Sequence, residues 1–87
     1  MNYNLYMTVI LGIKLANRLD VAIEFQKIIT EFGCAIQTRV GLHKTNDKYC
    51  ASSGIILLEV IDRKVLSNLE RELLKIDNIE IQRMIFN

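Results

Sequence analysis

The sequence contains no proline and no tryptophan, and it has few glycines, cysteines and histidines. Its 87 residues include four glycines, two cysteines and one histidine. Cys34 and Cys50 are too few for a disulfide-rich framework, so we expect reduced thiols. Without proline-rich or low-complexity stretches a flexible linker is not expected, and we predict one domain over residues 1–87.

An excess of charge of one sign is also missing. Lys and Arg number 11 against 10 Asp and Glu, which gives a formal net charge of +1. Proteins that hold nucleic acid through its phosphates usually carry a clear positive excess, so we expect no direct nucleic-acid binding.

Long hydrophobic runs are absent as well. The longest apolar stretches, at 5–13 and 55–61, are much shorter than the roughly 20 residues that a membrane-spanning helix needs. Residues 1–4 have no basic leader. We therefore expect a cytoplasmic protein without a membrane partner.

What the sequence has in plenty is apolar side chains, at 51% of the residues. A domain of this length buries only about 60% of its unfolded surface. Small domains with more apolar residues than one core needs often bury the surplus by oligomerisation. The composition therefore predicts association with other protein molecules.

The hydrophobic periodicity predicts six elements. Alternation of apolar and polar residues predicts strands at about 4–14, 34–42, 55–61 and 79–86, and a helical spacing follows Asn17 and Asp62. These two residues are the expected N-caps, and Gly33 is expected to end the first helix with a left-handed φ. The order predicts an α+β, ferredoxin-like βαββαβ fold, with two helices on one face of a four-stranded antiparallel sheet.

The face of this sheet that the helices leave uncovered is predicted to be apolar. The residues expected there are Tyr6, Thr8, Ile10, Ile55, Leu57, Met84 and Phe86. Apolar patches of this kind generally mark an interface, so we predict an oligomer interface. The alternative is that some of these residues lie at strand ends and are merely half exposed. Arg83 breaks the alternation of the last strand, and a bulge or a strand end is the expected reason.

Catalytic motifs are missing from the sequence. It has no phosphate-binding loop, dinucleotide fingerprint or nucleophile elbow, and any histidine-dependent pair would have to use His43. Strand 55–61 lacks the aromatic residues of an RNA-recognition motif. We therefore predict no catalytic residues and no enzyme activity.

His43 and Cys50 are weak candidates for a metal site. They lie seven residues apart in one predicted hairpin and could face each other, forming half of a transition-metal site that a second subunit completes. The alternative, which we favour, is a loop histidine and a small half-buried thiol. Cys34 lies at the far end of its strand, about 25–30 Å from His43, and cannot join it within one subunit.

Arg39 and Lys14 are candidates for binding an anion at an oligomer interface, because both are expected on the uncovered face. The alternative is that their stems lie along apolar surface while their charged ends remain in water. For a small effector, the candidate binding residues are Arg39, Gly41 and His43.

Three segments resemble a known family. Residues 9–13, 28–33 and 36–42 are similar to the small iron-only hydrogenase system regulators, and Arg39-Val40-Gly41-Leu42 is the sharpest match. These are stand-alone ACT-like domains, similar in fold to the effector domain of the nickel-responsive regulator. The resemblance covers about residues 6–85.

The resemblance implies a non-catalytic regulatory or ligand-sensing domain that forms a homodimer or homotetramer. It implies a small-molecule effector or a partner protein, and a link to the expression or maturation of iron-only hydrogenase. This leading hypothesis requires no cofactor. The second hypothesis is a metal-binding or metal-sensing protein with a His/Cys site shared between subunits.

Overall fold

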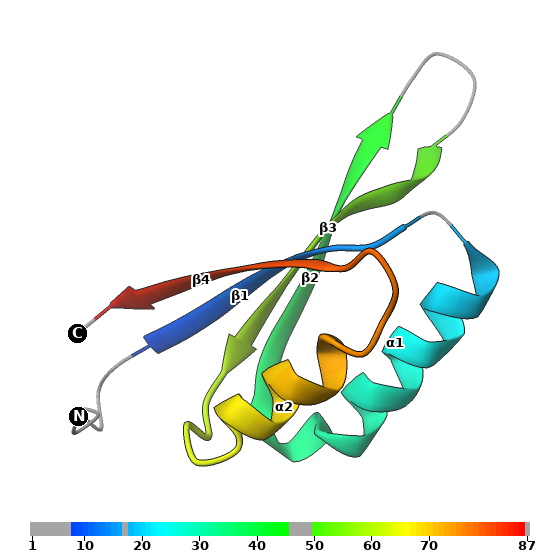
Figure 1. Cartoon of the computed structure of the whole chain (residues 1–87). Coiled ribbons are helices and arrows are strands. Elements are labelled where there is room, and N and C mark those ends of the chain that lie inside the picture. Colours follow the sequence, from blue (N-terminus) through cyan, green and yellow to red (C-terminus); the bar gives the residue numbers. More distant parts are fainter. Residues whose placement is uncertain (1–7, 17, 46–49, 87) are drawn as a thin grey trace.

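The predicted alternation of strands and helices is present in the computed structural model, which describes residues 8–16, 18–45 and 50–86, with the backbone alone at 42–45 and 50–53 (Figure 1). The elements of these described residues are β1 (Thr8–Lys14), α1 (Leu19–Glu31), the 3₁₀ turn η1 (Gly33–Ala35), β2 (Ile36–Thr45), β3 (Cys50–Val60), α2 (Leu66–Leu73) and β4 (Glu80–Phe86). Tyr6 and Asn17 lie outside the described residues.

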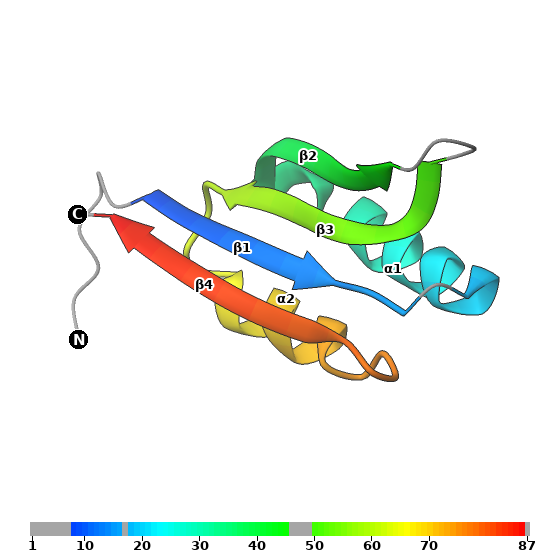
Figure 2. The same cartoon turned by 90° about the horizontal axis from the view of Figure 1, so that it is seen from above.

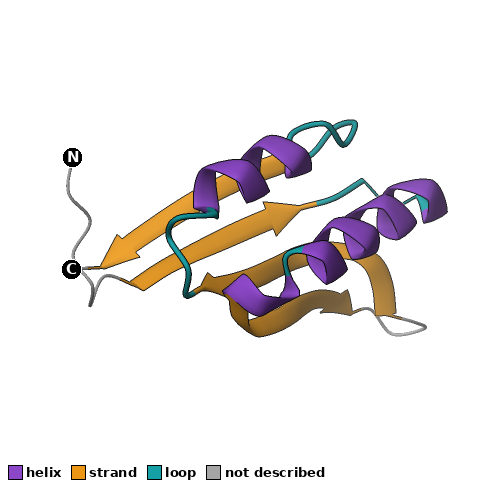
Figure 3. Ribbon diagram, turned by 90° about the horizontal axis from the view of Figure 1, so that it is seen from below, coloured by secondary structure: helices purple, strands orange, loops and turns teal. Residues whose placement is uncertain are grey.

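The strands form one antiparallel sheet in the order β2-β3-β1-β4. β1 and β3 are therefore central, and β2 and β4 are the edges. Both helices lie against the same face, as Figures 2 and 3 show from opposite sides. This arrangement confirms the ferredoxin-like α+β fold. We call the two sides the helix-covered face and the open sheet face.

The core lies between the helices and the sheet, and it is apolar. Its buried residues are Val9, Leu11, Ile13, Leu58 and Val60 from the central strands, Val21, Phe25, Ile28 and Ile29 from α1, and Leu66, Leu69, Leu73 and Ile76 from α2 and the turn after it. Alternate residues of β1 and β3 point into it, as a pleated strand requires. Among the described residues no polar or charged side chain is buried.

The helix ends differ from the sequence prediction. α1 begins after Arg18, whose side chain makes no cap hydrogen bond. Asp62 does not cap α2, because its Oδ1 accepts a hydrogen bond from the Lys64 N–H, at 3.0 Å, in a turn that precedes the helix. A short carboxylate side chain that accepts a hydrogen bond from a backbone N–H in such a turn is no longer available to cap the helix.

The left-handed conformation predicted for Gly33 is also wrong. Gly33 has no positive φ and lies in the 3₁₀ turn η1, which leads directly into β2. Asn78 has the left-handed conformation instead, with φ 59°, in the turn before β4. Asparagine tolerates this region better than most residues, which suits it to a tight helix-to-strand connection.

β4 is regular in spite of Arg83. Its described pairs with β1 run residue for residue from Phe86 opposite Thr8 to Glu80 opposite Lys14, so the expected bulge is wrong. Arg83 lies on the helix-covered face, where its Nη2 is 2.7 Å from Oε1 of Glu70 in α2. An ion pair therefore stands where the alternation would have placed an apolar contact.

Candidate functional site

The open sheet face is where the exposed apolar residues of the strands gather. Residues paired across neighbouring strands lie on the same face of a sheet, so the registers define its rows. One row is Thr38, Glu59, Ile10 and Met84; the next is Val40, Leu57, Gly12 and Gln82. Lys14 follows between Ile55 and Glu80, and Thr8 and Phe86 pair at the other end.

The described residues predicted as an oligomer interface all lie on this face, in the rows and pairs just given. Ile55 is 43% exposed, Met84 44% and Phe86 56%, while Thr8, Ile10 and Leu57 are half-buried. Sequence reasoning missed Val40, which pairs with Leu57 and is 43% exposed. Whether these residues form an interface stays a prediction.

The open sheet face is divided into two apolar halves. One half lies over β2 and β3 and contains Val40, Ile55 and Leu57; the other lies over β1 and β4. Between them stand Gly12 and Glu59, and the Glu59 carboxylate accepts a hydrogen bond from Thr38 Oγ1 at 2.9 Å. The Leu57 side chain lies 3.7 Å from the point that a Cβ on Gly12 would occupy, so Leu57 leans over the glycine toward the second half.

Arg39 is not on the open sheet face, and its expected position is wrong. The register of β2 against β3 shifts between Ile36 and Thr38, so one additional residue stands in β2. A bulge of this kind reverses which residues face which side. Arg39 therefore pairs with Leu58 on the helix-covered face.

The Arg39 side chain connects β2 to α1. Its Nη1 donates a hydrogen bond to Gln26 Oε1 at 2.8 Å, and its guanidinium carbon lies 5.6 Å from the centre of the Phe25 ring. These contacts use the guanidinium within the subunit. Of the two expected anion-binding residues, Lys14 is the one found on the open sheet face.

Gly41 and His43 continue along β2 from Arg39. Gly41 pairs with Ile56, and His43 pairs with Gly54. Arg39, Gly41 and His43 thus occupy alternate positions of one edge strand. Their role in binding an effector stays a prediction.

The predicted metal pair does not align in the hairpin. Cys50 pairs with Thr45, and His43 with Gly54, and a register shift separates the two pairs. The side chains of His43 and Cys50 lie outside the described residues. Within the described part, no group of three or more His, Cys, Asp or Glu could hold a metal ion. Cys34 is free and exposed.

A shallow hollow lies beside β4 on the helix-covered side. Ser67, Glu70, Arg71 and Leu74 line it from α2 and the residue after it, together with Arg83 from β4, and its volume is about 350 Å³. Glu70 and Arg83 are ion-paired within it, and Arg71 donates a hydrogen bond to Asn68. The sequence could not indicate this hollow, because it forms between two elements that are apart along the chain.

An exposed ion pair stands at the start of α1. Arg18 Nη2 is 2.7 Å from Asp20 Oδ2, and both side chains are well exposed. The hydrogen bond from Arg18 lowers the pKa of the Asp20 carboxyl, and the same contact raises the pKa of Arg18. Asp20 stands in the first helical turn, where a negative charge suits the helix dipole.

Comparison with known proteins supports the fold and goes no further. No family model and no curated protein sequence matches the chain. The uncharacterized protein TM1266 from Thermotoga maritima has a similar structure, with a TM-score of 0.75, 20% identity and 92% of this chain and 96% of that chain covered. The de novo designed protein Foldit4 aligns with a TM-score of 0.58, 10% identity and coverages of 93% and 97%.

The helices can also be compared with the length of a membrane span. Among the described residues, no helix is sufficiently long and apolar to cross a bilayer.

Proposed function

We propose that the chain is a non-catalytic regulatory or ligand-sensing domain that works as a homo-oligomer. The observation that supports this proposal is the open sheet face, which carries half-exposed aliphatic residues on the central strands as well as at the edges. Val40, Ile55, Met84 and Phe86 are each more than 40% exposed there. Apolar surface left in water costs free energy, at about 25 cal/mol per Å², and a second copy laid on this face would bury it.

The proposed interface joins the sheets of two copies face to face. Sheets pack about 10 Å apart when their inner faces interdigitate. Leu57 is the central residue of this contact, because it leans over Gly12 and connects the two apolar halves. Glu59 and Thr38 already satisfy each other by a hydrogen bond, which lowers the cost of bringing them to an interface.

The proposed mechanism is a shift of population between subunit arrangements. Arg39, Gly41 and His43 lie along the β2 edge, beside this face-to-face contact rather than within it. A small effector bound at that edge against a neighbouring copy would favour the subunit arrangement that binds it more tightly. The β2–β3 hairpin extends beyond the helices, so it is the element that could reach a neighbouring copy (Figure 1). We assign the domain to the cytoplasm, with regulation exerted through its own oligomer or through a partner protein.

The proposed pathway is the expression or maturation of iron-only hydrogenase. It is supported by the sequence resemblance at 9–13, 28–33 and 36–42 and by a fold of the same class. We assign no reaction to the chain, because the sequence offers one histidine and no nucleophile–base pair.

Native mass spectrometry of the purified protein, before any chelator is added, tests this proposal. We expect a dimer or tetramer for the natural chain and a smaller assembly for Leu57→Lys, because a buried ammonium without a partner is costly. Ile23→Lys is the control, since Ile23 is 60% exposed on α1, away from the open sheet face.

A bare monomer at micromolar concentration, or a Leu57→Lys oligomer as large as the natural one, would contradict the proposed interface. Additional mass on the oligomer would report the effector directly. A metal-sized excess that disappears in Cys50→Ser would favour the metal-sensing hypothesis instead.

A further inference from the structure

β4 is an edge strand whose second half lacks the usual protection. Within the described part of the chain, β4 pairs only with β1, so the backbone groups of its other edge have no strand beside them. Natural proteins protect such edges with proline, bulges or charged side chains, and the charged residues of β4, Glu80 and Arg83, both precede Met84. β4 reads Glu-Ile-Gln-Arg-Met-Ile-Phe and keeps an unbroken register with β1. The opposite edge, β2, is interrupted by two register shifts.

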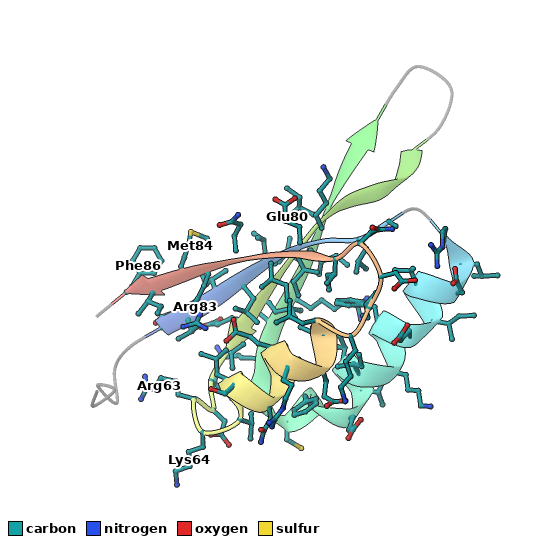
Figure 4. The ribbon with its side chains drawn as sticks, viewed as in Figure 1. Arg63, Lys64, Glu80, Arg83, Met84 and Phe86 are labelled. Atoms are coloured by element: carbon teal, nitrogen blue, oxygen red, sulfur yellow. The ribbon has the colours of Figure 1, made fainter. Side chains whose placement is uncertain are left out.

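The second half of β4 is apolar on both faces. Met84, Ile85 and Phe86 are consecutive and are 44%, 41% and 56% exposed. Successive strand residues point to opposite faces, and Figure 4 shows Met84 and Phe86 on one side of β4 and Arg83 on the other. An exposed apolar edge of this kind is an aggregation hazard unless a specific partner covers it.

The hollow beside β4 extends the same surface onto α2. Leu74 is 64% exposed at its rim, and Ser67 and Arg71 lie along its wall. A strand added next to β4 would place its own helix-side residues against this hollow. The unprotected edge and the hollow therefore point to one and the same contact.

We propose that β4 pairs antiparallel with β4 of a second copy across a two-fold axis, joining both sheets into one. A two-fold axis perpendicular to the sheet keeps the open sheet faces of both copies on the same side. It also places one residue of β4 directly opposite the same residue in the partner's β4. Full overlap of the strand, 80–86, puts Arg83 on the axis. Ile81 then pairs with the partner's Ile85, and Gln82 with the partner's Met84.

A second copy fits this edge better than an unrelated chain because the strand is self-complementary. The full-overlap register brings Ile81 and Ile85 together twice on the helix-covered face, once on each side of the axis. Each Arg83 already has its Glu70 at 2.7 Å, so two ion pairs meet at the axis rather than two free cations. The formal net charge of +1 per chain adds little repulsion between copies.

This contact deepens the proposed homo-oligomer, and it rests on that proposal only in requiring that copies associate. The edge and the open sheet face are different surfaces. If both are used, edge-joined dimers stack face to face and a tetramer results.

Disulfide trapping tests the register directly. In a Cys34→Ser, Cys50→Ser background, Arg83→Cys would face its own copy with Cα atoms about 4.5–5.5 Å apart, within disulfide range. Glu80→Cys is the control on the same strand. The two substituted positions would lie three residues from the axis on opposite sides, roughly 20 Å apart, which is too far for a disulfide. We expect a covalent dimer for Arg83→Cys under mild oxidation, and none for Glu80→Cys. Equal yields from both variants, or no covalent dimer from Arg83→Cys, would overturn the register.

Ile85→Lys provides a second measurement that does not depend on cysteine chemistry. Ile85 is 41% exposed, so the folded subunit should accept lysine there, which circular dichroism verifies. Native mass spectra should show Ile85→Lys removing the edge contact, Leu57→Lys removing the face contact, and the double variant as a monomer. An Ile85→Lys oligomer of natural mass would refute the edge contact alone. A Leu57→Lys oligomer of natural mass would refute the face contact alone.

Discussion

Arg39 and Arg83 have equivalent positions on the two edges of the sheet. Arg39 extends from β2 to Gln26 and Phe25 of α1, and Arg83 extends from β4 to Glu70 of α2. Each side chain lies on the helix-covered face where the core meets water. A long stem that covers apolar surface and a head that pairs at its margin suit this position. Each arginine therefore connects one edge strand to one helix.

Asp20 should titrate below the usual aspartate range. The Arg18 hydrogen bond lowers its pKa, and Arg18→Ala should return the pKa toward 3.8. A lowered pKa stabilises the fold above the unfolded-state pKa, and this contribution disappears as the pH falls through the folded-state value. Side-chain carboxyl NMR over an acid titration measures it. An unchanged Asp20 pKa in Arg18→Ala would show that the ion pair does not form in solution.

At the scale of elements, packing rather than local signals holds the helices. Neither helix has a side-chain cap hydrogen bond among the described residues. α2 has eight residues, and isolated helices shorter than about 12–15 residues are marginal in water. Its stability therefore comes from its buried residues Leu66, Leu69 and Leu73, which pack into the core beneath the sheet.

Leu73 and Leu74 test this dependence as a matched pair of neighbours. Leu73 is fully buried at 0% exposure and Leu74 is 64% exposed. Leu73→Ala should lower the free energy of unfolding by about 2–4 kcal/mol, because it removes transfer energy and leaves a cavity. Leu74→Ala should change it by less than about 0.5 kcal/mol. Urea unfolding of dilute protein gives both values, and equal losses would mean that α2 is not docked as described.

On the scale of the whole molecule, the uncovered apolar surface couples stability to association. The open sheet face and the β4 edge both carry aliphatic residues that the single chain leaves in water. Burying them between copies stabilises the folded state by mass action, since the unfolded chain has no such surface.

The thermal midpoint should therefore rise with protein concentration. For the natural chain we expect the midpoint to rise as the protein concentration is raised a hundredfold. We expect a weaker concentration dependence for Leu57→Lys and for Ile85→Lys. The double variant should melt at one temperature throughout the series. Differential scanning fluorimetry with an external dye suffices for the measurement. A natural chain with a constant midpoint would contradict both proposed contacts.

The sequence alone determined the element order and the faces of most elements. The alternation predicted for 4–14 and 55–61 agrees with the burial of Val9, Leu11, Leu58 and Val60, and the helical spacing after Asp62 agrees with the burial of Leu66, Leu69 and Leu73. In α1 the buried residues Val21, Phe25, Ile28 and Ile29 recur at helical spacing, as the periodicity after residue 17 predicts. Local periodicity suffices for these assignments, since one face of each element must be apolar to fold at all.

The tertiary structure decided what depends on pairing between distant segments. The additional residue in β2 between Ile36 and Thr38 exists only relative to β3, and it sends Val40 to the open sheet face and Arg39 to the helix-covered face. The Glu70 partner of Arg83 comes from another element, so no local pattern could show why an arginine interrupts β4. Strand order, which leaves β4 as an unprotected edge, is likewise a property of the assembled sheet. Local sequence encodes which way a regular element faces, whereas registers, bulges and ion pairs between elements arise from contacts across the fold.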